Sequence, residues 1–374
     1  MIRVAYILES FDLAGAEKSV FHIVKFINRA KFTPVMISLE VGGKLEKEFD
    51  IFNIEHYVIN TGSLLSIKGM IKFYKIINHL NIDIIHSNTL KSHIQSRLIG
   101  FFFNNKKIIS TYRNEPQWLK SKQIRNVIRK LLDRFTARFF SDMLTFVSYG
   151  TFKFFKMNGF HHSKTEVVYN SIDTELIENI KFSKKDIMKD FNVKENEIVI
   201  VAIGRLTEQK GFEYLFPAIN EVAKEVRNIK FLIFGEDQSS GYYKKLLSKY
   251  NFINVLIIDS YTNILQVLSC ADIFVSSSLW EGLPRGHLES LLCGCPVIST
   301  NIGGSNEVIK HEYNGILVTP RNSNEIINAI YKILNSQKMV ESFKYNGYKI
   351  LKDKFDIKKN TIKIENLYLS LYND

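Results

Sequence analysis

The sequence contains few cysteines and no apolar stretch of membrane-spanning length. Three of its 374 residues are cysteine, 45% are hydrophobic and 24% are charged, which argues against a disulfide scaffold, a collagen and a disordered chain. No stretch approaches the roughly 18 to 20 apolar residues that a spanning helix needs. The start, residues 1–11, is too short for a signal peptide and contains Glu9. We expect a soluble globular protein of two or three domains.

The three cysteines, Cys270, Cys293 and Cys295, fit a reducing compartment. Two of them form a C-x-C pair, which is too close for the usual zinc spacing, and no second cysteine or histidine pair completes four ligands. We interpret all three as small core residues and expect no metal site.

Acidic residues are scarce in the first half of the chain. Residues 1–180 hold 25 Lys and Arg against 16 Asp and Glu, a net charge of +9, whereas residues 181–374 hold 25 against 22, a net charge of +3. The first half therefore carries most of the formal charge of +12. Such a positive field can attract nucleic acid, an anionic membrane surface or a phosphorylated ligand.

Short β-branched runs alternate with amphipathic segments along the chain, which is typical of parallel sheets joined by crossover helices. The predicted strands of the first half are Arg3–Leu8, Pro34–Leu39, Asp83–His86, Lys107–Thr111, Met143–Val147 and Glu166–Tyr169. Those of the second half are Ile198–Ile203, Lys230–Phe234, Val255–Ile258, Ile273–Ser276 and Pro296–Ser299. A polar, lysine-rich stretch from Ser171 to about Asn196 follows the first set, and we place the boundary between domains 1–175 and 176–356 there.

The predicted fold is α/β, with two Rossmann-like doubly wound domains facing across a cleft. Ligands of open parallel sheets bind beyond the carboxyl ends of the strands, so the loops from strand to helix are the candidate sites. The first such loop contains Gly15 and leads into Val20, Ile23 and Val24 at helical spacing. Gly15 fits either a tight turn or a loop whose backbone approaches a phosphate.

The predicted strand Ile198–Ile203 leads into a basic loop that has a glycine at each edge. Arg205 and Lys210 lie five residues apart between Gly204 and Gly211. Arginine offers a bidentate fork and lysine a point charge, so the two cations can hold a diphosphate from two sides. The alternative is a solvated surface turn.

The densest motif runs from Ser276 to Val297 and predicts a strand end, a Gly/Pro loop, a short helix that stops at Gly294, and another strand. Glu281 lies in the loop and Glu289, eight positions on, lies in the helix. The two carboxylates are then separated by about one or two helical turns, so they can meet different ends of one ligand.

This stretch resembles the E-x7-E signature of the retaining glycosyltransferases of family 4, which have the GT-B fold. The resemblance extends over almost the whole chain. Its other motifs are Gly15-Ala16-Glu17-Lys18, Tyr169-Asn170-Ser171-Ile172-Asp173, Gly204-Arg205, Lys210-Gly211, Phe234-Gly235-Glu236, Gly303-Gly304-Ser305-Asn306-Glu307-Val308 and Asn314-Gly315.

The resemblance implies a role for each of these residues. Arg205 and Lys210 would hold the diphosphate of a nucleotide sugar, Glu289 would bind the ribose hydroxyls, and Glu281 would contact the donor sugar. Backbone N–H groups near the phosphates and the sugar would come from Gly15, Gly286, His287 and Leu288. The last helix, about 357–374, would pack back onto the first domain.

No D-x-D pair occurs in the sequence, the carboxylate device that holds a metal in the other large glycosyltransferase fold. Negative charge that develops on the leaving diphosphate needs fixed cations or a metal, and Arg205 with Lys210 would then serve without a metal. We therefore expect no cofactor. The resemblance also implies transfer with retention of anomeric configuration.

One position departs from the family pattern. Members of the family often place a histidine after the strand that corresponds to Lys107–Thr111, and here Arg113 takes that place. Arginine cannot act as a base, although it can bind an anionic sugar or an acceptor phosphate. His86, at the end of another strand, is the nearest alternative for a direct role, or it is a hydrogen-bonded wall residue.

Residues 118–140 hold seven Lys and Arg against one acid. Apolar residues recur there at helical spacing. They are Ile124, Val127, Ile128, Leu131, Leu132, Phe135 and Phe139. The simpler interpretation is a surface helix that packs this stripe inward and leaves its basic face in water. The second, which we favour because relatives that extend lipid-linked glycans find their acceptor in a membrane, adds that the basic face with Trp118 and Phe140 rests on anionic lipid.

The leading hypothesis is a cytoplasmic glycosyltransferase, peripheral at the inner face of the cytoplasmic membrane. It would use a nucleotide sugar, with UDP as the expected nucleotide, to extend a lipid-linked glycan of a capsule, O-antigen or exopolysaccharide. The alternatives are a GT-B-fold epimerase or phosphorylase, and an inactive nucleotide-sugar-binding protein. Nucleic acid is not expected as a partner, because no recognition motif accompanies the charge.

Overall fold

A computed structural model describes the chain except for residues 13, 102–105, 177–188, 251, 253, 260, 262 and 374. It divides into two units, which are described separately. The first unit comprises residues Met1–Ser171 and Ile357–Asp374, and the second comprises Ile172–Asp356. The boundary predicted at 175/176 lies four residues beyond this division, and most of the polar stretch that suggested it, 177–188, lies outside the described residues.

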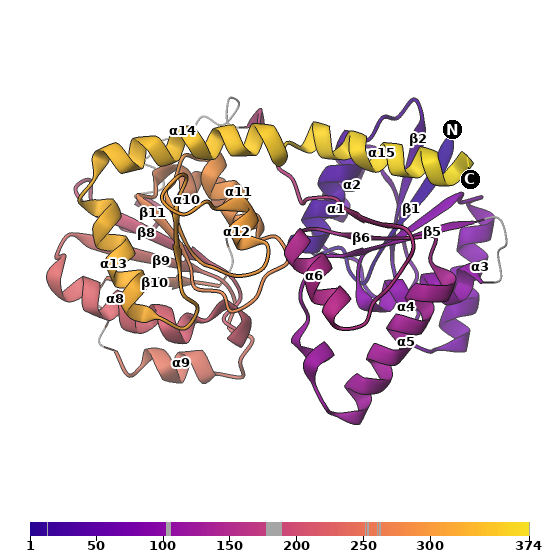
Figure 1. The fold of residues 1–374 in the computed structure, drawn as a ribbon, viewed down its shortest axis with the longest axis horizontal. Helices are drawn as coiled ribbons and strands as arrows, with labels where there is room; N and C mark the ends of the chain where they lie inside the picture. The colour runs from indigo at the N-terminus through magenta and orange to yellow at the C-terminus, as the bar shows by residue number, and fades with distance from the viewer. Residues whose placement is uncertain are drawn as a thin grey trace. The chain divides into compact units, whose positions relative to one another are not determined.

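The described part of the first unit contains a seven-stranded parallel sheet with strand order β3-β2-β1-β4-β5-β6-β7 (Figure 1). Its strands are β1 (Ile2–Leu8), β2 (Phe32–Ser38), β3 (Glu55–Val58), β4 (Ile84–Ser87), β5 (Lys107–Tyr112), β6 (Met143–Phe146) and β7 (Thr165–Val167). Its helices are α1 (Gly15–Phe26), α2 (Glu46–Ile51), α3 (Ile67–His79), α4 (Leu90–Gly100), η1 (Gln117–Lys120), α5 (Ile124–Phe140), α6 (Tyr149–Met157) and α15 (Ile357–Asn373).

The described part of the second unit contains a six-stranded parallel sheet with strand order β10-β9-β8-β11-β12-β13. Its strands are β8 (Ile198–Ile203), β9 (Ile229–Phe234), β10 (Val255–Ile258), β11 (Ile273–Ser276), β12 (Val297–Thr300) and β13 (Ile316–Val318). Its helices are η3 (Glu208–Lys210), α8 (Phe212–Glu225), α9 (Tyr242–Leu247), α10 (Ile264–Cys270), α11 (Arg285–Leu292), α12 (Ser305–Val308), α13 (Ser323–Leu334) and α14 (Gln337–Lys354). In each unit the second and third strands lie on one side of the first strand and the later strands lie on its other side, which is the doubly wound arrangement.

The predicted strands are all present, but two further strands were missed. They are β3 and β13, and each lies at the edge of its sheet. An edge strand pairs on one side only and needs less apolar sequence than a central strand that is covered on both faces. The four residues of β3 are accordingly half-buried or exposed, so their pattern does not stand out from the neighbouring loops.

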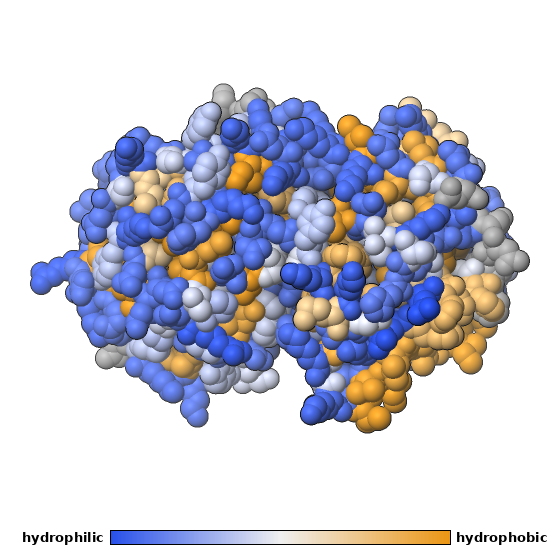
Figure 2. All heavy atoms as spheres, in the orientation of Figure 1, coloured by the Kyte–Doolittle hydropathy of each residue, from blue (hydrophilic) through white to orange (hydrophobic). Residues whose placement is uncertain are grey.

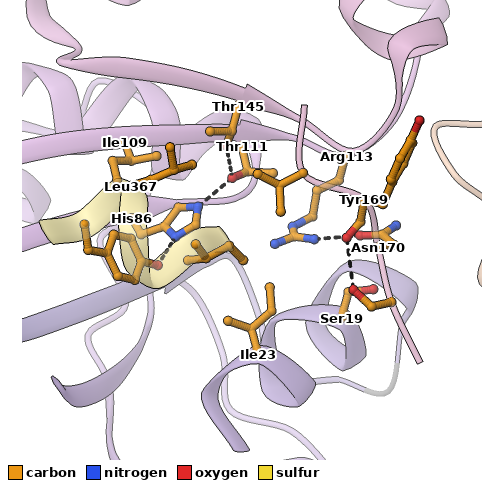
Figure 3. Close-up of a pocket in the computed structure, with 14 residues that line it drawn as sticks. Ser19, Ile23, His86, Ile109, Thr111, Arg113, Thr145, Tyr169, Asn170 and Leu367 are labelled. Atoms are coloured by element: carbon orange, nitrogen blue, oxygen red, sulfur yellow. Dashed lines mark hydrogen bonds between the residues drawn. The ribbon is translucent and has the colours of Figure 1, made fainter. Parts of the chain in front are cut away.

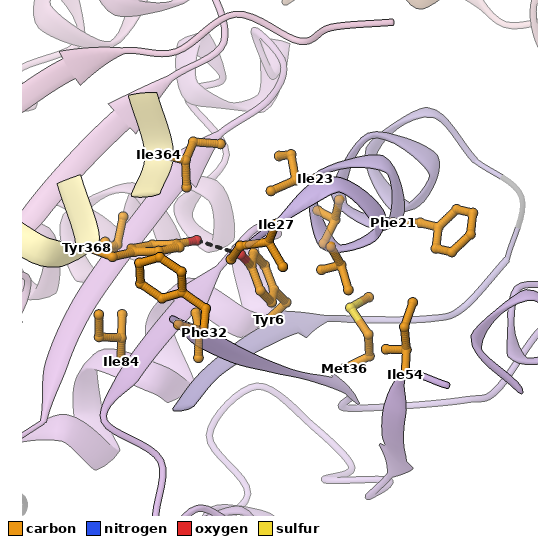
Figure 4. Packing of buried hydrophobic residues seen from close by; sticks show 14 of the residues in the cluster. Tyr6, Phe21, Ile23, Ile27, Phe32, Met36, Ile54, Ile84, Ile364 and Tyr368 are labelled. Carbon is orange, nitrogen blue, oxygen red and sulfur yellow. Dashed lines mark hydrogen bonds between the residues drawn. The ribbon is translucent and has the colours of Figure 1, made fainter. Parts of the chain in front are cut away.

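Hydrophobic layers cover both faces of the first sheet. One layer packs α1 and α15 on the strands, and the other packs α3 and α4 on the opposite face. The predicted last helix is α15, drawn in yellow in Figure 1, and it lies against α1. Tyr368 of α15 donates a hydrogen bond of 3.0 Å to Tyr6 of β1 inside this layer (Figure 4). The end of the chain therefore completes the core of the first unit.

Helix α5 forms where the basic segment predicts a helix, but its orientation is the reverse of the prediction. The apolar stripe was expected to face inward. Instead, Ile124, Ile128, Leu131, Phe135 and Phe139 are more than half exposed, at 75%, 57%, 55%, 54% and 61%. Trp118, expected on the surface, packs against the buried cluster around Tyr112 and Phe155.

The reason for this reversal is a buried ion pair. The face of α5 that points inward carries Asp133, Thr136 and Ala137. Arg97 of α4 is fully buried and donates from Nη1 to Asp133 Oδ1 at 2.6 Å. An unpaired charge in this position would cost far more than exposing a few apolar side chains. The ion pair therefore decides which side of the helix is buried.

In the part of the chain that the structure describes, no helix is long and apolar enough to cross a membrane. The three cysteines are free thiols; Cys270 and Cys295 are buried and Cys293 is partly buried.

Asp133→Ala should lower the free energy of unfolding by about 3–5 kcal/mol, because it leaves the Arg97 guanidinium buried without its carboxylate. Urea denaturation followed by circular dichroism measures the change. Glu221→Ala is the matched control, since it removes an exposed ion pair with Lys224 and should barely alter stability. If both variants unfold at the same urea concentration, the buried pair does not have the importance assigned to it.

Candidate active site

The basic loop of the second unit folds back on itself through its two glycines. Gly204 follows β8 with φ of 154°, and a Cβ atom on it would lie 2.8 Å from the Lys210 side chain. Gly211 has φ of 60°, in the left-handed region, and a Cβ atom there would lie 2.2 Å from the Ser277 carbonyl oxygen. Both φ values favour glycine, and at Gly211 the backbone of the segment after β11 also occupies the space of a side chain.

The two cations of this loop have different surroundings. Arg205 is exposed, and its Nη1 donates to Gln238 Oε1 at 3.2 Å. Lys210 Nζ lies 2.5 Å from Glu281 Oε1, and Glu281 is buried. Arg205 therefore presents its charge to solvent, whereas the charge of Lys210 is paired.

Glu281 is held by three side chains. Besides Lys210, Ser278 Oγ donates to Glu281 Oε1 at 2.8 Å and Gln209 Nε2 donates to Oε2 at 3.4 Å. These contacts join the loop after β8 to the loop after β11, so the carboxyl ends of two adjacent strands converge on one carboxylate. The carboxylate is fixed in place by this convergence.

Glu289 lies on α11, which begins directly after the loop that carries Glu281. Arg285 Nε, one turn earlier on the same helix, donates to Glu289 Oε1 at 2.7 Å. Both side chains are largely buried. The second expected ligand-binding carboxylate is therefore also paired with a cation.

The first turn of α11 contains Gly286, His287 and Leu288. The side chains of His287 and Leu288 are buried, and His287 Nε2 lies 2.6 Å from Ser299 Oγ. The backbone N–H groups at the start of a helix have no partner within the helix and attract anions, which leaves backbone contacts as the role open to this turn. His287 N–H is bound at 3.3 Å to the Pro284 carbonyl oxygen.

In the first unit, Gly15 is the first residue of α1, and among the described residues no atom outside its chain neighbours and its own helix backbone lies within 4 Å of the position of a Cβ atom on it. A ligand can therefore approach the backbone there. Glu17, two residues further on, is buried, and its Oε2 has no hydrogen-bond partner among the described residues. Burial raises the pKa of Glu17, and the nearby Arg113 opposes this shift.

Arg113 follows β5 and is held by two asparagines, of which Figure 3 shows Asn170. Its Nε and Nη2 both donate to Asn88 Oδ1, at 2.9 and 2.7 Å, and its Nη1 donates to Asn170 Oδ1 at 3.0 Å. Burial lowers the pKa of Arg113 to about 10, and Glu17 raises it. The guanidinium stays charged at neutral pH, and both of its hydrogen-bonded neighbours are uncharged amides.

His86 of β4 has both ring nitrogens occupied (Figure 3). Nδ1 lies 2.6 Å from Tyr368 Oη and Nε2 lies 2.5 Å from Thr111 Oγ1. Burial, and then the charge of Arg113, lowers the pKa of His86 to about 3. A neutral imidazole has one donor and one acceptor nitrogen, and both are used here, which is the environment of a wall residue.

His86 and Arg113 line the same pocket of the first unit, beside Thr111 and Tyr368. Its cavity volume is about 20 Å³. This is room for about one water molecule and not for a sugar ring. The structure therefore brings the two residues together around a small cavity.

Five positioning residues were missed by the sequence analysis: Asn88, Asn170, Gln209, Ser278 and Arg285. Asn170 lies within a motif that carries the family resemblance, and Arg285 stands four residues before Glu289 on a predicted helix, so both had a local signal. Gln209 lies inside the basic loop and Ser278 inside the motif that begins at Ser276, but nothing in their local pattern marks them as partners of Glu281. Asn88 lies outside these motifs and had no local signal.

Two family models match the sequence. Glycosyltransferase Family 4 matches residues 13–176, and Glycosyl transferases group 1 matches residues 183–350. The chain belongs to glycosyltransferase family 4. As a glycosyltransferase it is an enzyme of the transferase class, as the motifs predicted.

Curated relatives cover nearly its full length. This glycosyltransferase is 23% identical to the UDP-Gal:alpha-D-GlcNAc-diphosphoundecaprenol alpha-1,3-galactosyltransferase of Escherichia coli, over 99% of its own chain and 97% of that protein. It is 26% identical to the capsular polysaccharide biosynthesis glycosyltransferase CapH of Staphylococcus aureus, over 99% of both chains.

Solved structures share the fold. HepE of Anabaena, in complex with UDP-glucose, superposes with a TM-score of 0.86 at 20% identity, over 99% of this chain and 100% of that chain. WaaG, a glycosyltransferase involved in lipopolysaccharide biosynthesis, superposes with a TM-score of 0.77 at 14% identity, over 97% of this chain and 99% of that chain. These likenesses confirm the predicted fold class, two Rossmann-like α/β domains of the GT-B type.

The stability of the glycosyltransferase should fall as the pH drops from about 7 to about 5. His86 and His287 have their pKa lowered to about 3 by burial, and the pKa of His93 is also well below its usual value. Below pH 6.5 the unfolded chain takes up protons on these residues and the folded chain does not. Below pH 6.5, each of these histidines then lowers the free energy of unfolding by about 1.4 kcal/mol per pH unit. Urea denaturation at a series of pH values measures this slope.

His86→Asn should reduce this slope, and His79→Asn, which changes an exposed histidine, should leave it as it is. A free energy of unfolding that stays constant from pH 7 to pH 5 would show that these histidines are not buried in their neutral form.

Proposed function

We propose that this enzyme transfers a sugar from a nucleotide diphosphate sugar, UDP-linked, to a lipid-linked glycan during the synthesis of a cell-surface polysaccharide, with retention of anomeric configuration and without a metal. The observation that carries the donor part is the pair of fixed carboxylates, Glu281 with Lys210 in the loop after β11 and Glu289 with Arg285 on α11, the helix that follows this loop. The E. coli relative named for a diphosphoundecaprenol substrate supports the acceptor class.

The chemistry requires charge stabilisation at the leaving group. When the bond between the anomeric carbon and the diphosphate oxygen breaks, negative charge grows on the diphosphate. Arg205 offers a solvent-facing fork and Lys210 a second cation beside it in the loop, and the N–H groups of the first turn of α11 add donors. Glu289 would bind the ribose hydroxyls and Glu281 the donor sugar.

Arg113 would bind a negative charge and would not transfer a proton, because guanidinium does not deprotonate under these conditions. Its grip by Asn88 and Asn170 preorganises the fork without neutralising it. His86 would orient the wall behind it through Thr111 and Tyr368. Departure and attack on one face of the sugar, within one ion pair, would give retention without a protein nucleophile.

Two alternatives are separated by product analysis. An epimerase or phosphorylase changes the donor without a glycan acceptor, whereas a transferase needs one. An inactive binding protein would be stabilised by UDP in a thermal-shift assay and show no turnover with any acceptor. A parallel thermal shift with GDP distinguishes the base preference.

Transfer should survive EDTA. If Arg205 and Lys210 neutralise the leaving diphosphate, chelation leaves the rate of donor consumption unchanged within about twofold. The assay measures UDP release from a panel of UDP-sugars with and without chelator. Activity that is lost on chelation and restored by Mg²⁺ or Mn²⁺ would refute the cation-clamp account.

Glu281→Ala should lower kcat by about a hundredfold, because it removes the contact with the donor sugar and leaves Lys210 without its carboxylate. UDP release under saturating donor measures the change. Glu312→Gln is the matched control, since Glu312 forms an exposed ion pair with Lys332 in the same unit. Near-wild-type turnover in Glu281→Ala would rule out the assigned role.

A further inference from the structure

The exposed apolar residues of α5 form one continuous ridge. Figure 2, in the orientation of Figure 1, shows orange side chains gathered over this helix in the first unit. The members of the ridge follow one another three or four positions apart. They are Ile124, Ile128, Leu131, Phe135 and Phe139. A soluble monomer rarely leaves such a contiguous apolar surface uncovered without a binding function.

The ridge cannot turn inward. Arg97 grips Asp133 on the opposite side of α5, and Lys130 Nζ donates to the Leu119 carbonyl oxygen at 3.1 Å and to Asn158 Oδ1 at 3.0 Å. Rotation of the helix would break all three contacts and leave a buried charge unpaired. The outward orientation is therefore built into the first unit.

Two arginines and a histidine stand beside the ridge and form a pocket with it. The pocket has a volume of about 220 Å³, far larger than the cavity at His86. Its lining residues are Leu131, Arg134, Phe135, Arg138, Gly159 and His161. A cluster of two guanidinium groups is suited to a phosphate.

The pocket depends on a glycine. Gly159 has φ of +81°, and a Cβ atom there would lie 2.6 Å from the Cζ atom of Arg134. The missing side chain leaves room for the guanidinium against the backbone. In the described part of the chain, neither Arg134 nor Arg138 forms an ion pair with a carboxylate. Their charges are therefore open to an external anion.

The apolar ridge and the two arginines together indicate which partner covers this face of α5. The one acid in residues 118–140 is Asp133, which is buried, so the exposed side of α5 presents apolar and basic groups and no acid. A second copy of the chain on this face would bring arginines against arginines. An anionic phospholipid bilayer supplies both partners at once, hydrocarbon for the ridge and phosphate for the arginines.

We propose that α5 is an interfacial membrane-binding helix that inserts its apolar ridge into an anionic bilayer and holds a lipid phosphate between Arg134, Arg138 and His161. The sequence favoured lipid on the basic face with Trp118 and Phe140; in the structure the apolar ridge is the exposed surface, and the lipid contact moves to it. This inference deepens the proposed function, since it says how the enzyme reaches a lipid-linked acceptor, but it is tested without measuring transfer.

The test is co-sedimentation of the full chain with vesicles of phosphatidylcholine, alone or mixed with phosphatidylglycerol. The wild-type chain should bind the mixed vesicles more tightly, and binding should weaken as salt is raised. Ile128→Ser/Leu131→Ser/Phe135→Ser should weaken binding at least about tenfold on both vesicles. Arg134→Gln/Arg138→Gln should weaken it about tenfold on mixed vesicles and remove most of the salt dependence.

Matched controls change exposed residues of the second unit. Tyr242→Ser/Tyr313→Ser/Tyr345→Ser controls for lost apolar surface, and Arg227→Gln/Lys249→Gln controls for lost charge. Both should bind as the wild type does. Thermal unfolding of each variant checks the fold, and Leu131→Ser alone replaces the triple variant if that variant unfolds early.

Failure to bind mixed vesicles, or a ridge variant that binds as well as the wild type, would overturn the proposal. Dimers in analytical ultracentrifugation that the ridge variant abolishes, without vesicle binding, would overturn it in favour of a second copy. Transfer to a water-soluble acceptor analogue separates this proposal from the proposed function. Transfer without vesicle binding would keep the glycosyl-transfer function and refute the membrane-binding helix. Vesicle binding without transfer would keep the membrane-binding helix and refute the proposed function.

Discussion

The buried ion pair between Arg97 and Asp133 determines how α4, β5 and α5 of the first unit are arranged. Arg97 is fully buried on α4 and also donates to Ser110 and to the Tyr112 hydroxyl, at 3.0 Å each. One guanidinium thus ties α4, β5 and α5 together. Its charge can stay in the interior only with a carboxylate beside it. Asp133 must therefore face inward, and the rest of α5 takes its orientation from that requirement.

The same arrangement of cation and acceptor recurs at the candidate site, with different consequences. Lys210 and Arg285 are each paired with a glutamate, which fixes one carboxylate in the loop after β11 and the other on the helix α11 that follows. Arg113 is held by two asparagines instead, so its position is fixed while its charge is not neutralised. A neutral grip keeps a cation available to a ligand, whereas a carboxylate grip positions the carboxylate.

Much of the fold was predictable because central parallel strands are covered on both faces and are therefore long apolar runs. The edge strands β3 and β13 escaped prediction, β3 because its residues are half-buried or exposed and β13 because it has only three residues. In the site, Glu281, Glu289, Arg205 and Lys210 were recognisable from motif spacing. The amides that grip Arg113 were not, because Asn88 and Asn170 lie far apart in the chain and meet only through strand order.

The sequence by itself determined the class of fold, the family and the helical nature of residues 124–140, because strand composition, loop motifs and apolar spacing are local properties. Only the tertiary structure decided which side of that helix is buried. Spacing predicts that one face is apolar, and ordinarily that face is inside. Here a single buried charge outweighs five apolar side chains, and its partner, Arg97, lies 36 residues away. Asp133 is the one acid in residues 118–140, and it is used to pair with Arg97 in the interior.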